Sequence, residues 1–97
     1  MNFVGKYCVI RAKDAGVFAG TVTEHNGQEV LLKDARRLWY WDGACSISQI
    51  AAEGVKKPGN CKFAMPVDEL GLLGVIEIIP ATEKAREIIE GVGIWKS

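Results

Sequence analysis

The sequence predicts an α+β domain, in which a twisted antiparallel β-sheet carries a short mid-chain helix and a C-terminal helix. Nine valines and nine isoleucines stand against six leucines, and β-branched side chains favour strands. The expected elements run as strands, a short helix, more strands and a last helix, and strands joined by tight hairpins must be antiparallel. At 97 residues the chain is short enough for residues 1–97 to form a single domain.

The first third of the chain is expected to consist of strands. They are predicted over residues 6–12, 17–24 and 28–33. The turn His25-Asn26-Gly27 joins the last two as a hairpin, because Asn and Gly both accept the positive φ of a type I′ turn. A break at Asp34-Ala35 then precedes a further strand over residues 36–41.

The rest of the chain predicts two capped helices with strands between them. Ser46 and Gln49 form a capping box that opens a helix over residues 47–53. Thr82 caps a second helix, which ends near Gly91. The apolar face of this second helix has the i, i+3, i+4, i+7 spacing and consists of Ala85, Ile88, Ile89 and Val92. Strands are expected over residues 62–70, weakened at Pro66, and over 72–79 as a central strand, and the tail 94–97 is expected to add a strand or dock on the sheet.

Charge and composition limit the classes of partner. Twelve basic and twelve acidic side chains give a net charge of zero, whereas a protein that grips a long phosphate backbone carries a basic excess, so generic DNA or RNA binding is not expected. No apolar run approaches the roughly 18–20 residues that span a bilayer, and no secretory signal pattern opens the chain, so no membrane partner is expected. Three widely spaced cysteines are typical of free thiols in the cytoplasm.

The motifs of common enzymes are missing from the sequence. His25 is the single histidine and lies beside a turn, and the cysteines form no C-x-x-C pair. No phosphate-binding loop, nucleophile elbow or zinc-protease motif is present. We therefore expect no metal and no cofactor, and a binding protein is favoured over an enzyme.

The segment Arg36-Arg37-Leu38-Trp39-Tyr40-Trp41 is the strongest functional candidate. In a strand, Arg37, Trp39 and Trp41 share one face, and Arg36 lies on the other. A guanidinium pairs with phosphate and an indole stacks on a base, so the pattern suits a nucleotide-like ligand. The alternative is structural, because tryptophans anchor small cores and arginine packs along indoles.

Weaker candidates lie on either side of this segment. Gly16 and Phe18 belong to Ala15-Gly16-Val17-Phe18-Ala19-Gly20, where the backbone can approach a ligand closely or simply turn into a strand. Ser46 lies at a helix N-terminus, which attracts anions, but it also serves as the cap of its own helix. Lys62 is a further candidate, with a solvated loop lysine as the alternative.

Four segments of the chain resemble small proteins of bacteriophages and prophages. They are Ala15–Gly20, Asn26–Val30, Ala35–Ala44 and Cys61–Phe63. This group is similar to the Thoeris anti-defence sponge proteins, which sequester cyclic ADP-ribose isomers and in some cases also cyclic oligonucleotides. The resemblance implies an antiparallel β-rich domain, assembled as a dimer or hexamer with ligands held between subunits, in the cytoplasm of the infected bacterial host.

Three functional hypotheses follow from these patterns. The first is a non-enzymatic phage protein that captures a small cyclic nucleotide-type immune signal. The second is an oligomeric interaction module that inhibits a host protein without a small-molecule ligand, and the third is a hydrolase of a nucleotide signal. A homo-oligomer is expected because three tryptophans and an edge strand with Pro66 are much for a 97-residue monomer to bury or protect.

Overall fold

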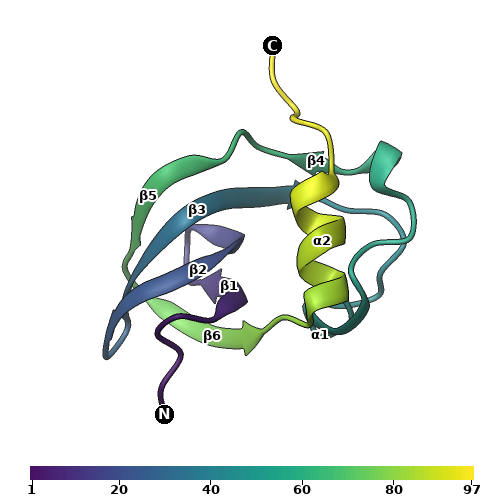
Figure 1. Ribbon diagram of the computed structural model, residues 1–97. Coiled ribbons are helices and arrows are strands. Elements are labelled where there is room, and N and C mark those ends of the chain that lie inside the picture. The colour runs from purple at the N-terminus through teal and green to yellow at the C-terminus, as the bar shows by residue number, and fades with distance from the viewer.

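The computed structural model describes all 97 residues, and its strands form one antiparallel sheet with two helices against it (Figure 1). The six-stranded sheet has the order β4-β3-β2-β1-β6, and β5 also pairs with β3. The strands are β1 (Tyr7–Ala12), β2 (Gly16–Asn26), β3 (Glu29–Tyr40), β4 (Lys62–Phe63), β5 (Val67–Leu72) and β6 (Val75–Pro80). The helices are α1 (Ile47–Glu53), α2 (Glu83–Gly91) and a short 3₁₀ helix, η1 (Pro58–Asn60). The predicted α+β class is confirmed.

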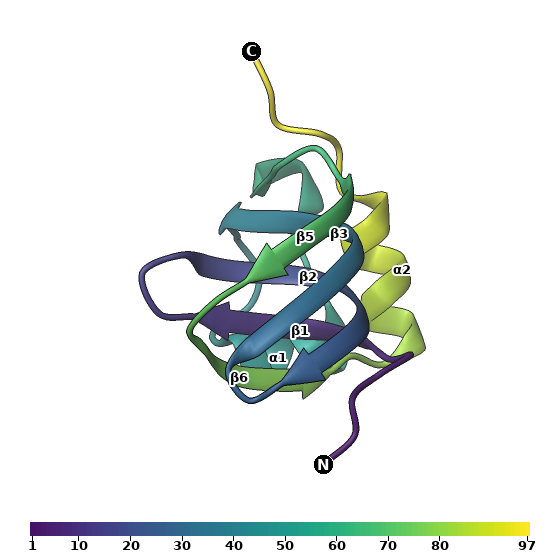
Figure 2. The same cartoon turned by 90° about the vertical axis from the view of Figure 1, so that its left-hand side faces the viewer.

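The sheet is curled, and two strands from its opposite sides, β5 and β6, follow one another directly in the chain. β5 pairs with β3 and β6 pairs with β1, yet only Leu73 and Gly74 lie between β5 and β6. Figure 2 shows the strands wrapping around a common interior. Two backbone hydrogen bonds hold the connection in place, from Lys13 N to Gly74 O at 2.8 Å and from Val75 N to Gln28 O at 3.0 Å.

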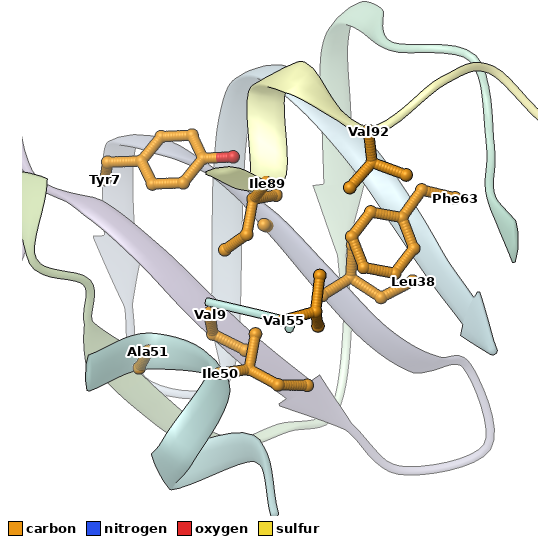
Figure 3. Close-up of a cluster of buried hydrophobic side chains, with 10 residues drawn as sticks. Tyr7, Val9, Leu38, Ile50, Ala51, Val55, Phe63, Ile89 and Val92 are labelled. Atoms are coloured by element: carbon orange, nitrogen blue, oxygen red, sulfur yellow. The ribbon is translucent and has the colours of Figure 1, made fainter. Parts of the chain in front are cut away.

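Both faces of the curled sheet carry a hydrophobic core. The interior of the curl is filled by side chains such as Cys8, Ile10 and Phe18. The outer face is covered by α1 and α2, and Figure 3 shows the cluster that they form with it. That cluster consists of Tyr7, Val9, Ala19, Leu38, Ile50, Ala51, Val55, Phe63, Ile89 and Val92. β1 lies between the two cores, which is why its residues 7–10 are all buried and follow no apolar–polar alternation.

A β-bulge in β3 decides which side chains face the helices. From Lys33 to Arg36, β3 advances three residues while its partner β2 advances two. Asp34 takes up the extra residue with a positive φ of 51°. Before the bulge, even-numbered side chains such as Leu32 point into the curl, and after it Leu38 points toward the helices.

The bulge corrects the predicted break at residues 34–35. β3 runs without interruption from Glu29 to Tyr40, so the two predicted segments form one bent strand, and Trp41 lies beyond its end. Gly20 of β2 lies against the bulge, where a Cβ atom would stand 3.0 Å from the Cα of Ala35. The close approach therefore favours glycine at this position.

The predictions for the helices are confirmed, caps included. Ser46 Oγ accepts a hydrogen bond from Gln49 N at 3.1 Å, and Thr82 Oγ1 accepts one from Ala85 N at 3.1 Å. Thr82 also donates to the carbonyl of Ala52 at 2.8 Å, which links the start of α2 to the end of α1. Neither helix has the length and the apolar character that crossing a bilayer would take.

The predictions for the later strands were partly wrong. The expected strand 62–70 is two strands, since residues 64–66 around Pro66 interrupt it. The expected central strand 72–79 begins only at Val75 and lies at an end of the sheet, with Ile76 half exposed. The β2–β3 turn lies one residue later than predicted. Its two loop residues are Gly27 and Gln28, and only the glycine has positive φ, as in a type II′ turn.

Candidate functional site

Arg36 is part of the helix-covered core. Only 3% of its surface is exposed, and all five of its N–H groups donate to backbone carbonyl oxygens. Nε donates to Ala64 O at 3.0 Å; Nη1 to Ile89 O at 3.1 Å and Val92 O at 2.8 Å; Nη2 to Phe63 O at 3.1 Å and Gly93 O at 3.5 Å. The side chain thus ties β3 to β4, to the C-terminal end of α2 and to the segment after it.

The charge of Arg36 is balanced by backbone dipoles and by the ring of Phe63, whose centre lies 5.6 Å from the guanidinium carbon. No carboxylate bonds to it, and burial lowers the pKa of its guanidinium. Carbonyls at the C-terminus of a helix carry partial negative charge, so the end of α2 stabilises this cation. A guanidinium with all donors used inside the fold has none left for a ligand, and Arg36 is therefore a structural residue.

Arg37 lies on the opposite face of β3 and is exposed. Its guanidinium carbon is 4.7 Å from the ring centre of Phe18, and neither of the chain's two ion pairs includes it. It lines a hollow of about 170 Å³ between β3, β5 and residues 64–66, which join β4 to β5. We call this place the open end of the curled sheet. The other lining residues carry no charge and are Phe18, Ala35, Ala64, Met65, Val67 and Leu70. A single cation thus stands at an apolar hollow, with its hydrogen-bond donors free.

Trp39 and Trp95 form an exposed aromatic pair beside Arg37. Their ring planes are parallel within 6°, with centroids 6.5 Å apart. Trp39 is 64% exposed and Trp95 49% exposed, so each indole still presents a large area to solvent. Lys62 Nζ lies 5.6 Å from the ring centre of Trp95 and 5.9 Å from that of Tyr40, which adds a positive charge to the pair.

A shallow groove on another side of Trp39 joins it to the β1–β2 turn. The groove has a volume of about 510 Å³ and includes Gly16, Arg11 and Lys13. Asp14 also lines it, and Arg11 is partly engaged by Glu77 at 3.1 Å. The structure therefore brings Gly16 and Trp39 to one groove although they are 23 positions apart in the sequence.

The remaining sequence candidates lie away from this surface or beneath it. Phe18 is fully buried in the interior of the curl and supports Arg37 from below. Trp41 packs against the helix-covered core, because the alternation of β3 ends at Tyr40. Ser46 is occupied as the cap of α1.

Sequence reasoning missed Trp95 as a site residue. The tail was expected to dock, and it does, through a parallel bridge between Phe63 and Ile94 and a hydrogen bond from Trp95 N to Phe63 O at 2.9 Å. A tryptophan shortly after the end of a helix indicates that the tail packs part of this large ring against the fold. The choice of β4 as the docking strand has no such local signal.

The fold and this surface define a small α+β protein with an exposed pair of indoles and with a lysine beside them. The chain belongs to the family described as a domain of unknown function (DUF6948), which matches residues 5–89. No curated protein and no solved structure matches the chain. The matched residues include the whole sheet and most of α2, and Trp95 lies beyond them.

Proposed function

We propose that this protein binds a small anionic nucleotide-type ligand at the open end of the sheet and holds it unchanged. One observation carries the proposal: the guanidinium of Arg37 has no hydrogen-bond or ion-pair partner in the fold, and Arg37 lies two residues before the exposed indole of Trp39. A phosphate on Arg37 would form charge-assisted hydrogen bonds, and a base on Trp39 would add stacking.

The charge distribution supports a small ligand over a polymer. The chain has no net charge, so attraction to a long phosphate backbone is weak. Lys62 still places one cation at the Trp95 ring, and Arg37 lies two residues from Trp39 in β3. Two local charges beside flat rings match a ligand with a few phosphates and one or two bases.

Capture is proposed in preference to cleavage because of what surrounds Arg37. Apart from Arg37 itself, the hollow is lined by side chains with no nucleophile and no general base. Together with the resemblance to the anti-defence sponge proteins, this supports a role as a phage protein that sequesters an immune signal. The proposed signals are a cyclic ADP-ribose isomer or a cyclic oligonucleotide.

The test is to mix the protein with cyclic ADP-ribose or a cyclic dinucleotide, remove free ligand by gel filtration, heat-denature the protein and analyse what is released. We expect intact nucleotide. Altered nucleotide would identify a hydrolase, and the absence of retained nucleotide would contradict the proposal.

A variant at Arg37 makes this test specific to the site. Arg37→Met keeps the apolar stem over Phe18 and removes the charge, so nucleotide affinity should fall about ten- to a hundredfold. Lys84→Ala is the matched control, since it removes one positive charge from an exposed position on α2. Equal losses in both variants would point to general electrostatics instead of a site.

A second candidate function is binding between protein surfaces, with a homo-oligomer as its simplest form. It is favoured by large apolar side chains that are about half exposed or more near the end of β3: Trp39, Tyr40, Met65, Ile94 and Trp95. Such a cluster is typical of interaction surfaces. Light scattering should then give a multiple of 10.6 kDa that Ile94→Glu reduces, whereas the monomer mass at micromolar protein would contradict it.

A further inference from the structure

The C-terminal segment holds Trp95 against Trp39 by a short series of contacts. Arg36 Nη2 donates to Phe63 O and, at 3.5 Å, to Gly93 O, while Trp95 N donates to the same Phe63 oxygen at 2.9 Å. The backbone of the segment is thus laid along β4. This attachment is what brings the Trp95 indole over to β3.

Few hydrogen bonds hold the C-terminal segment in this position. The bond to Gly93 O is the longest of the five that Arg36 makes, and beyond residue 94 a single backbone hydrogen bond holds the segment. A Cβ atom at Gly91 or Gly93 would have no neighbour within 4 Å, so nothing packs against these two positions. Few buried contacts and glycines on either side of Val92 are typical of a segment that opens locally.

The two indoles form a widely spaced parallel stack. Offset-stacked rings have centroids about 4.5–7 Å apart, and the distance of 6.5 Å between Trp39 and Trp95 is near the wide end of that range. A flat ring placed between two others needs roughly 7 Å between their planes, twice a carbon–carbon contact distance. The rings are already parallel within 6°, so the segment needs to shift outward without turning.

Positive charge lies close to the indole pair. Lys62 Nζ lies 5.6 Å from the Trp95 ring centre, and Lys96 follows Trp95 in the chain. A base between the indoles would therefore have its phosphates near an ammonium group. A flat ring that carried its own positive charge would be repelled by the same group.

We infer that Trp39 and Trp95 act as the two sides of a clamp, which takes the base of a nucleotide between the indoles while the C-terminal segment moves to admit it. The inference rests on the proposed function and names the part of the ligand that the surface recognises, a nucleobase with phosphates attached. Trp95 is then a binding residue, although no enclosed pocket surrounds it.

The experiment uses three probes on the full chain: ADP-ribose, adenosine, which lacks phosphate, and ribose 5-phosphate, which lacks a base. The variants are Trp95→Phe, which keeps a flat ring, and Trp95→Leu, which keeps apolar area without one. Loss of one base stack should weaken ADP-ribose binding about ten- to a hundredfold in Trp95→Leu and clearly less in Trp95→Phe. Ribose 5-phosphate should bind weakly and equally to all three proteins.

The outcomes separate the clamp from the proposed function. If ADP-ribose binds the wild type and Trp95→Leu binds it as tightly or more tightly, the clamp is overturned and nucleotide binding stands. If adenosine binds as tightly as ADP-ribose and Trp95→Leu loses both, the clamp stands and the preference for an anionic ligand is overturned. A wild-type protein that binds none of the probes overturns both. Thermal unfolding of each variant confirms that the fold is retained, as expected for a half-exposed side chain.

Discussion

Arg36 and Arg37 are neighbours in one strand and lie in opposite surroundings. The guanidinium of Arg36 is buried under α2 and uses five donors on five carbonyls, whereas that of Arg37 stands at the open end of the sheet with its donors free. The same side chain therefore serves the fold in one place and is available to a ligand in the next. The face of the sheet decides between these roles, and the bulge at Asp34 decides the face.

The largest expected effect on stability is the difference between two single variants, Arg36→Met and Arg37→Met. Arg36→Met removes all five of these hydrogen bonds, three of which are buried, and should lower the free energy of unfolding by about 3–5 kcal/mol. Arg37→Met should change it by less than about 0.5 kcal/mol, because that side chain is exposed. Urea denaturation followed by tryptophan fluorescence measures both.

Arg36→Lys provides the second measurement where Arg36→Met fails to fold. Lysine keeps the positive charge but has three donors where arginine has five, so part of the stability should return. If the two methionine variants were equally stable, the conclusion that Arg36 but not Arg37 supports the fold would be wrong.

The next effect concerns the bulge that sets the two faces. In Gly20→Ala the new methyl group would stand 3.0 Å from Ala35 Cα and 3.2 Å from Lys33 O, both of them backbone atoms, so we expect a loss of about 1–3 kcal/mol. Gly71→Ala is the control, since a Cβ atom there meets nothing within 4 Å, and its stability should stay within about 0.5 kcal/mol. A Gly20→Ala protein as stable as the control would show that the bulge yields easily.

β1 offers the same contrast between the two cores at Tyr7 and Cys8. Burial raises the pKa of the Tyr7 phenol well above its usual value and that of the Cys8 thiol to about 11. Since both groups are neutral when protonated, their contribution to stability is complete below the unfolded pKa, 9.0 for the thiol, and is lost as the pH rises through the folded value. The free energy of unfolding should therefore fall from about pH 9 upward.

Tyr7→Phe separates the two groups. The Tyr7 hydroxyl is buried without a hydrogen-bond partner, so its removal should leave stability at pH 7 unchanged or raise it by up to about 1 kcal/mol, and should flatten the alkaline decline. Tyr40→Phe, at a half-exposed position, should change neither. A clear loss of stability in Tyr7→Phe at pH 7 would mean that the hydroxyl is bonded after all.

The smallest effect is one of thiol reactivity and needs no mutation. Cys45 is exposed, Cys61 is half-buried and Cys8 is fully buried, and none of the three is paired. Alkylation at pH 8 followed by mass spectrometry should modify Cys45 first, Cys61 more slowly and Cys8 only after unfolding. Early modification of Cys8 would show that the interior of the curl opens in the native state.

Local signals in the sequence predicted the parts of the fold that depend on neighbours in the chain. The caps at Ser46 and Thr82 each involve residues three positions apart, and both were predicted. The sequence predicts a break at Asp34 where the structure has a bulge, because a polar residue that disfavours strands is expected at a break and at a bulge alike. The position of β6 at an end of the sheet depends on how the whole sheet curls, which no short window contains.

The candidate site was predictable to the same extent. Alternation in a strand placed Arg36 and Arg37 on opposite faces, and the structure has them so. Which face α2 covers is decided by contacts between residues 53 to 57 positions apart, from Arg36 to Ile89, Val92 and Gly93. The pairing of Trp39 with Trp95 spans a similar separation, so the aromatic segment alone predicts only one member of the indole pair.

The five carbonyls around Arg36 also determine when this part of the fold can form during synthesis. Phe63 and Ala64 leave the ribosome 27 and 28 residues after Arg36, whereas Ile89, Val92 and Gly93 leave it 53 to 57 residues after it. A guanidinium is costly to desolvate before its acceptors are present. The nascent sheet is therefore expected to keep that face hydrated until α2 has emerged, which makes the final docking of the helix a late event and leaves the incomplete chain open to chaperones and proteases.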